Sequence, residues 1–174
     1  MRLCIFLACG FVATFSTAAM ADTAPTLLGS FKDWSAFQSN TVGDGKTCYI
    51  MAQPHSSVPA KAKRDPIYFL ISDWPRRKAK GEMQIIPGYR YKDGSPVTAQ
   101  IGSEKVAFFS RDNGGTGSAW VKDPADEARL ADDMRRSVQV VITGVSQRGT
   151  TTHDTYLLDG IGQALDRIHA ACGM

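Results

Sequence analysis

The sequence predicts a mainly β protein: an immunoglobulin-like antiparallel β-sandwich with two short helices, one of them C-terminal. Short apolar and β-branched runs recur along the chain, separated by glycine, proline, asparagine and aspartate. Only two segments have the apolar spacing of an amphipathic helix, and the second closes the chain. We therefore expect one domain over residues 22–174, preceded by a separate leader over residues 1–21.

The strand patterns begin after a small, polar lead-in over residues 22–30. Residues 48–52 form a first β-type run behind a glycine-rich turn. Residues 67–71 are continuously apolar, which is typical of a strand covered on both faces. Residues 82–85 alternate between polar and apolar, and Pro87 then ends or bends that strand.

The second half of the chain continues the pattern with longer runs. Residues 97–101 and 105–109 flank Gly102-Ser103, a pair that favours a two-residue hairpin. Two further strands are expected over residues 138–145 and 150–158. The whole chain then holds about seven or eight short strands, as in a sandwich.

The first helix is expected between these strands, because Asp123 can cap it and Pro124 occupies its first position. Acidic residues follow in its first turn, and basic residues fill its last turn, so both ends complement the helix dipole. Its apolar stripe is expected to comprise Ala128, Ala131 and Met134.

The second helix starts near Asp159 and carries apolar residues at steps of four, three and four. These residues are Ile161, Leu165, Ile168 and Cys172. Cys172 therefore faces the sheet with the apolar side chains.

The first 21 residues predict a secretory signal peptide. Arg2 precedes an apolar run from Leu3 to Phe15, and Ala19-Met20-Ala21 matches an A-x-A cleavage site. The run is shorter than the 20 or so apolar residues of a membrane span. Lipidation at Cys9 is the other alternative, but it leaves the residues up to Ala21 unexplained. Periplasmic localisation is therefore expected, with surface association as an alternative.

Cysteine usage agrees with export. Cys48 and Cys172 are the cysteines that remain after cleavage, and an oxidising compartment favours their disulfide. Two unpaired buried thiols are the alternative. No C-x-x-C motif points to redox catalysis.

Composition and motifs narrow the classes of function. The 174 residues carry 20 basic and 17 acidic side chains, a balance that argues against a nucleic-acid partner. No metal-ligand spacing and no cofactor motif occurs, so no cofactor is expected. A hydrolase with His153 or His55 as the base of a scattered site remains the alternative to a non-enzymatic protein.

Basic residues follow the predicted strand at 67–71 and form the candidate ligand contact. They are Arg76, Arg77, Lys78 and Lys80. Such groups bind phosphate and carboxylate, which favours an envelope glycan, lipopolysaccharide or a host-cell surface as partner. Trp74 adds an aromatic surface beside them. Cations that only keep an exported domain soluble are the alternative interpretation.

Several motifs along the mature chain resemble the invasion-associated locus B family of exported alphaproteobacterial proteins. The motifs are Phe31-Lys32-Asp33-Trp34, Lys46-Thr47-Cys48-Tyr49, Arg64-Asp65-Pro66-Ile67-Tyr68, Ala119-Trp120-Val121-Lys122, Val145-Ser146-Gln147-Arg148-Gly149-Thr150, Asp154-Thr155-Tyr156-Leu157-Leu158 and Ala164-Leu165-Asp166-Arg167. Lys32 stands where many members have glycine, and the absence of cysteine over 35–47 is consistent with a branch that has one disulfide.

The resemblance implies a periplasmic or surface-associated β-sandwich, linked by name to host-cell invasion and virulence. The family offers no established catalytic residues, so none is assigned. The leading hypothesis is a non-enzymatic binding or envelope-homeostasis module. A surface adhesin that binds anionic glycans through the basic residues at 76–80 is a further alternative.

Overall fold

The computed structural model describes residues 24–41, 43–112 and 115–174, so the predicted leader at 1–21 lies outside the described residues. The strands are β1 (Thr26–Phe31), β2 (Trp34–Thr41), β3 (Gly45–Ala52), β4 (Ser56–Val58), β5 (Tyr68–Trp74), β6 (Ala79–Ile86), β7 (Val97–Ile101), β8 (Glu104–Asp112), β9 (Gly117–Val121), β10 (Gln139–Val145) and β11 (Thr151–Leu157). The helices are α1 (Pro124–Arg136) and α2 (Ile161–Cys172), and Pro75–Arg77 form a 3-10 turn, η1.

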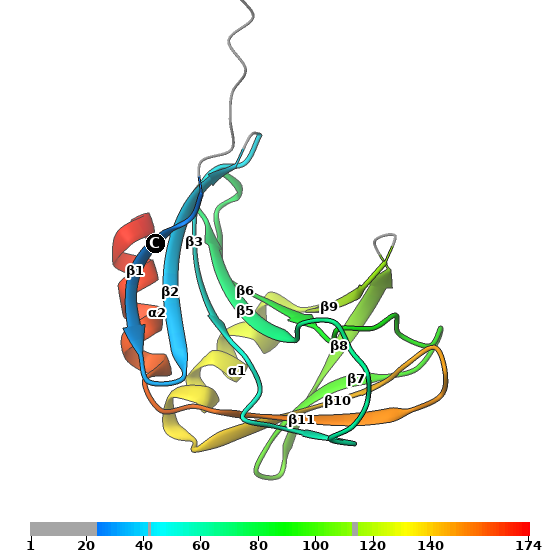
Figure 1. The fold of residues 1–174 in the computed structure, drawn as a ribbon. Coiled ribbons are helices and arrows are strands. Elements are labelled where there is room, and N and C mark those ends of the chain that lie inside the picture. The colour runs from blue at the N-terminus through cyan, green and yellow to red at the C-terminus, as the bar shows by residue number, and fades with distance from the viewer. Residues whose placement is uncertain (1–23, 42, 113–114) are drawn as a thin grey trace, which may run out of the picture.

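All eleven described strands belong to one antiparallel sheet, in the order β1-β2-β3-β5-β6-β9-β8-β7-β10-β11-β4. Figure 1 shows this sheet bent over, with β1, β2 and β3 standing across β10 and β11. The predicted mainly β, antiparallel, sandwich-like architecture with two helices is thus confirmed. Its two layers are halves of one sheet, and the described residues hold more strands than the seven or eight expected.

An aromatic chain across the inner faces holds the two halves together. Trp34 on β2 meets Phe69 on β5 edge-on with ring centroids 5.9 Å apart, and Phe69 meets Tyr156 on β11 at 5.5 Å. The indole Nε1 of Trp34 also donates to the Leu157 carbonyl at 3.0 Å. All three rings are fully buried. Strands far apart in the sheet order therefore share one core.

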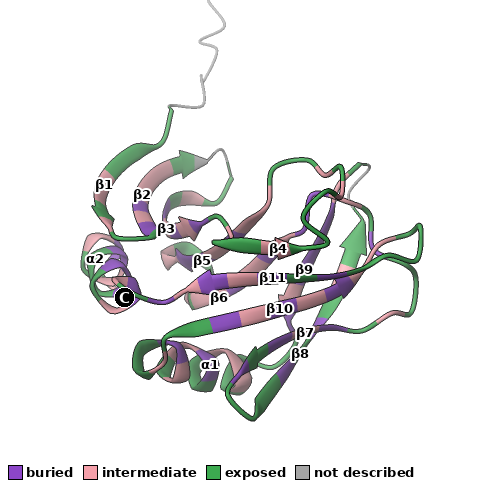
Figure 2. Ribbon diagram, turned by 60° about the horizontal axis from the view of Figure 1, so that its bottom comes forward, coloured by how far each residue is buried: buried purple, intermediate pink, exposed green. Residues whose placement is uncertain are grey.

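Alternation along the strands sets which side chains reach this core. Figure 2 shows buried segments alternating with more exposed ones along β10 and β11. In β6, Met83 and Ile85 are buried while Glu82 and Gln84 point the other way. The outward-facing residues of β5, β6, β8 and β9 consequently share a second, solvent-facing surface.

The lead-in expected over residues 22–30 is wrong in part, because β1 begins at Thr26 and pairs with β2. Strand β1 lies at the exposed edge of the sheet, so few of its side chains need to be apolar. Gly29 also interrupts the alternation of inward and outward side chains along the strand. The three-residue β4 was also not predicted, and it pairs with β11 from a distant part of the chain. Neither strand has a local sequence signal of sufficient length.

Helix α1 begins as predicted, with Pro124 in its first turn and the Asp123 side chain accepting from the Ala125 amide at 2.9 Å. Its packing face keeps Ala131 and Met134 of the predicted stripe but has Leu130 in place of Ala128. Leu130 and Met134 are buried, whereas Ala128 is exposed. The larger apolar side chain at Leu130 decides which face turns inward, since it removes more apolar area from water than an alanine.

Helix α2 packs against β1, β2, β3 and β5, and its predicted apolar face is confirmed. The buried residues are Ile161, Ala164, Leu165, Ile168 and Cys172. Cys172 and Cys48 form a disulfide with their Cα atoms 5.9 Å apart. Gly160 precedes the helix at φ 85°, and a Cβ there would lie 2.3 Å from the Phe31 carbonyl oxygen, so only glycine fits.

Candidate functional site

A groove of about 790 Å³ lies on the solvent-facing side of the sheet, beside the start of α1. We call it the aromatic groove. It is lined by Trp74, Arg77, Lys78, Ala79, Lys80, Glu82, Gln84, Phe109, Arg111, Trp120, Val121, Lys122, Pro124 and Glu127. These residues come from β5, β6 and the connection between them, from β8 and β9, and from the start of α1. Five of these residues are cationic, and three are aromatic.

Aromatic rings form the floor of the groove. Phe109 and Trp120 lie directly opposite each other on β8 and β9 and stack at 5.9 Å with an interplanar angle of 29°. Phe109 is 37 % exposed, which is high for a large apolar side chain. The guanidinium of Arg111 lies 5.4 Å from the Phe109 ring centre, and that of Arg77 lies 4.1 Å from the Trp74 ring centre. The floor therefore offers flat apolar surface edged by cations.

The predicted basic residues divide into paired and unpaired groups. Arg77 forms an ion pair with Glu82 at 3.2 Å and a longer one with Asp44 at 3.9 Å. Lys78 and Lys80 also line the groove, and both are exposed. Their ammonium groups have no ion-pair or hydrogen-bond partner among the described residues. The charge available to a ligand therefore comes from these two lysines more than from Arg77.

Arg76, the fourth residue of the predicted ligand contact, does not line this groove. Its Nη1 donates to the Gly43 carbonyl at 2.7 Å, toward the β2–β3 turn. Arg77 instead lies over the Trp74 ring and pairs with Glu82, so the two guanidinium groups have different main partners. The sequence places both in one cluster and does not reveal this divergence.

Sequence reasoning also missed groove residues that are distant along the chain. Phe109 and Trp120 are brought together only by the β8–β9 pairing, and Lys122 follows β9. The strand alternation offered a signal, because Phe108 and Val121 are buried and their neighbours must face outward. Lys122 has an exposed side chain without a partner among the described residues.

Glu127 closes one end of the groove from helix α1. Its Oε1 accepts from the Met83 amide at 2.8 Å, where β6 extends past its pairing with β9. Burial raises the pKa of the Glu127 carboxyl, the Met83 amide opposes this rise, and the nearby Glu82 charge adds to it. The carboxyl thus has a structural hydrogen bond and a perturbed pKa in the same place.

Among the described residues, the two histidines proposed for hydrolysis make one contact with a hydroxyl, that of the His153 ring with Thr143. His153 Nδ1 lies 3.0 Å from the Thr143 hydroxyl on an exposed strand pair. His55 and Ser35 line one shallow hollow, but no hydrogen bond connects them. His169 on α2 contacts the fully buried Asp73 at 2.6 Å. That pair ties α2 to β5.

Residues 24–41, 43–112 and 115–174 contain no group of three or more His, Cys, Asp or Glu that could hold a metal ion. None of their helices is long and apolar enough to cross a membrane. Together with the fold, these observations define a small, mainly β protein that is closed by one disulfide and carries an open aromatic and cationic groove.

The chain belongs to the invasion associated locus B (IalB) protein family, whose model matches residues 34–169. The resemblance expected from the sequence motifs is therefore confirmed. The structure is also similar to the crystal structure of invasion associated protein B from Bartonella henselae, with a TM-score of 0.59 and 14 % sequence identity. That match covers 87 % of this chain and 100 % of the other, and it shows a shared fold. No curated protein matches the sequence.

Proposed function

We propose that this chain is an exported, non-enzymatic envelope protein that binds acidic glycans in the aromatic groove. The stacked Phe109–Trp120 pair with the unpaired Lys78 and Lys80 beside it is the observation that carries this proposal. The C–H faces of a sugar ring are apolar and pack well against flat aromatic rings. Ammonium groups attract the carboxylates of an acidic glycan.

Export and a periplasmic location are supported by the leader pattern over residues 1–21 and by the disulfide. A disulfide that joins two buried cysteines is typical of proteins in an oxidising compartment. The family is not known for enzymatic activity, which favours binding over catalysis. Acidic glycans also occur on host-cell surfaces, so the same groove could bind a host cell. Such binding would connect the protein to invasion.

The open shape of the groove also favours a polymer. Its residues come from β5, β6, β8, β9 and α1, so it runs across several strands and is not enclosed. A long ligand can lie along such a surface and contact cations at both ends. Lys78 and Lys80 border one side, whereas Lys122 and Arg111 border the strands β8 and β9.

The test measures binding of the mature protein to a polyuronate and to neutral dextran by calorimetry, at low and high salt. We expect binding to the polyuronate only, weakened by salt because the attraction is electrostatic. The double variant Lys78→Glu/Lys80→Glu should lose this binding, and Phe109→Ser should weaken it without changing its salt dependence. Lys105→Glu is the matched control, since Lys105 is an exposed lysine that does not line the groove.

Retained polyuronate binding in the double variant would refute the assignment of this groove. Equal binding of dextran and polyuronate would refute the acidic character of the ligand.

A further inference from the structure

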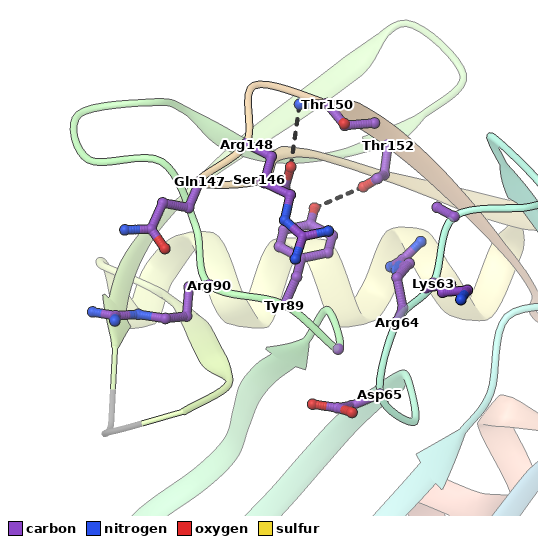
Figure 3. A pocket seen from close by; sticks show the side chains of 12 residues that line it. Lys63, Arg64, Asp65, Tyr89, Arg90, Ser146, Gln147, Arg148, Thr150 and Thr152 are labelled. Carbon is purple, nitrogen blue, oxygen red and sulfur yellow. Dashed lines mark hydrogen bonds between the residues drawn. The ribbon is translucent and has the colours of Figure 1, made fainter.

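A second pocket of about 570 Å³ lies apart from the aromatic groove, between three connecting segments (Figure 3). The segments are residues 62–65, residues 88–90, and the turn between β10 and β11 with the first residues of β11. None of its lining residues is shared with the aromatic groove. We call it the turn pocket.

Backbone hydrogen bonds fix the walls of the turn pocket. The Asp65 amide donates to the Gly88 carbonyl at 2.9 Å, and the Gln147 amide donates to the Arg90 carbonyl at 2.7 Å. Gly88 has φ 72°, and a Cβ there would lie 2.1 Å from the Asp65 carbonyl oxygen. Only glycine allows this close approach, so Gly88 is required for the contact between residues 62–65 and residues 88–90. The pocket therefore exists before any ligand arrives.

The floor of the pocket is polar, and its polar groups already have partners within the protein. The Tyr89 hydroxyl lies 2.7 Å from the Thr152 hydroxyl, and Figure 3 shows this contact at the centre of the pocket. Burial raises the pKa of Tyr89, although its bond to Thr152 and the nearby charge of Arg64 oppose this, so the phenol stays neutral. Arg64 lies over the Tyr89 ring at 5.0 Å and forms an ion pair with Asp154 at 2.6 Å.

Two cationic side chains at the walls form no ion pair or hydrogen bond with other described residues. Lys63 and Arg148 are exposed and line the pocket from different segments, and neither side chain has a partner among the described residues. Arg90 is already paired with Asp112 at 3.1 Å. Asp65 is an acidic residue of the lining, and Figure 3 shows its carboxylate on the side away from Arg148.

We propose that the turn pocket binds a phosphate monoester carried on a small hydroxylated molecule, such as a sugar phosphate. A phosphate monoester has a charge of about −1.5 to −2 at neutral pH, which two unpaired cations match. Its oxygens accept from several directions, so it can contact a guanidinium and an ammonium at once. The neighbouring Ser146, Gln147 and Thr150 offer hydroxyl and amide groups to the sugar.

The test titrates glucose 1-phosphate into the isotope-labelled mature protein and follows amide NMR shifts, with glucose and inorganic phosphate as separate probes. We expect shifts at residues 63–65 and 146–150 with the sugar phosphate, and none with glucose. Lys63→Met and Arg148→Gln should each weaken binding about tenfold or more, since a hydrogen bond to a charged group contributes about 1.5–3 kcal/mol. Lys105→Met and Arg136→Gln are matched controls away from the pocket.

A second arm distinguishes a soluble ligand from a lipid headgroup. Vesicles with phosphatidic acid carry the same phosphate monoester, and vesicles of phosphatidylcholine do not. Binding of either source that depends on Lys63 and Arg148 supports the proposal and names the source. Binding of neither source, or binding that both variants retain, overturns it. The Lys78→Glu/Lys80→Glu variant should bind the phosphate normally, so failure of the aromatic groove and failure of this pocket remain distinguishable.

Discussion

The buried ion pair between Arg64 and Asp154 should behave as one energetic unit. Their side chains are 5 % and 3 % exposed, and two hydrogen bonds of 2.8 and 2.6 Å join them. Arg64 also donates to the Pro87 carbonyl at 2.8 Å, and Asp154 accepts from the Ser57 hydroxyl at 2.7 Å. The pair thus fixes the 59–66 segment onto β11 and β4.

Removing one partner leaves the other charge buried without compensation. We expect Asp154→Leu and Arg64→Met each to lower the free energy of unfolding by about 3–5 kcal/mol. That loss is a large fraction of the roughly 5–15 kcal/mol of a typical domain. The double variant removes both charges, so its free energy of unfolding should lie within about 2 kcal/mol of the wild type. The coupling energy of the double-mutant cycle is the loss of the double variant minus the sum of the two single losses, and it shows whether the two charges act as a unit.

Urea unfolding followed by tryptophan fluorescence and far-ultraviolet circular dichroism measures all four proteins under identical oxidising conditions. Equal m-values would show that the unfolding transitions are comparable. If the two single losses simply add in the double variant, the pair is not coupled and the reasoning is wrong. If Asp154→Asn, which keeps the shape, costs less than about 1 kcal/mol, the burial argument fails as well.

Two other predictions concern the disulfide and Glu127. The Cys48→Ala/Cys172→Ala variant should lose about 5 kcal/mol of unfolding free energy in the chain-entropy model, because the bond spans 124 residues; unchanged urea stability would contradict this. Glu127 has a raised folded-state pKa, so its contribution to stability is present at low pH and is lost as pH rises through that pKa. Glu127→Gln keeps an oxygen that accepts from the Met83 amide. Relative to the wild type, this variant should become more stable as pH rises above the pKa of the Glu127 carboxyl. A difference in urea midpoint that does not change with pH would refute this.

Much of the fold could be predicted because its signals are local. The Asp123 cap and the Pro124 start of α1 depend on adjacent residues, and the apolar face of α2 depends on spacing within twelve residues. Cys172 lies on that face, which brings it to the sheet and to Cys48. Local propensity and periodicity were sufficient there.

The rest depends on contacts that sequence patterns do not encode. Strand β4 is only three residues long, and its pairing with β11 joins segments nearly one hundred residues apart, such as Ser57 and Asp154. The aromatic groove needs the β8–β9 register to set Phe109 opposite Trp120. Of the predicted cationic residues, Arg77, Lys78 and Lys80 line the groove, whereas Arg76 bonds to the Gly43 carbonyl, a contact that the sequence does not encode.

Helix α2 is held by contacts from several early strands. Cys172 bonds to β3, His169 contacts Asp73 on β5, Arg167 donates to the Leu28 carbonyl on β1, and Lys46 donates to the Ala171 carbonyl. A chain that emerges from its N-terminus first therefore presents β1, β2 and β3 with one apolar face uncovered until α2 follows. The interior can close only once α2 has docked, and a chain that lacks α2 would have to be protected from association by some other surface.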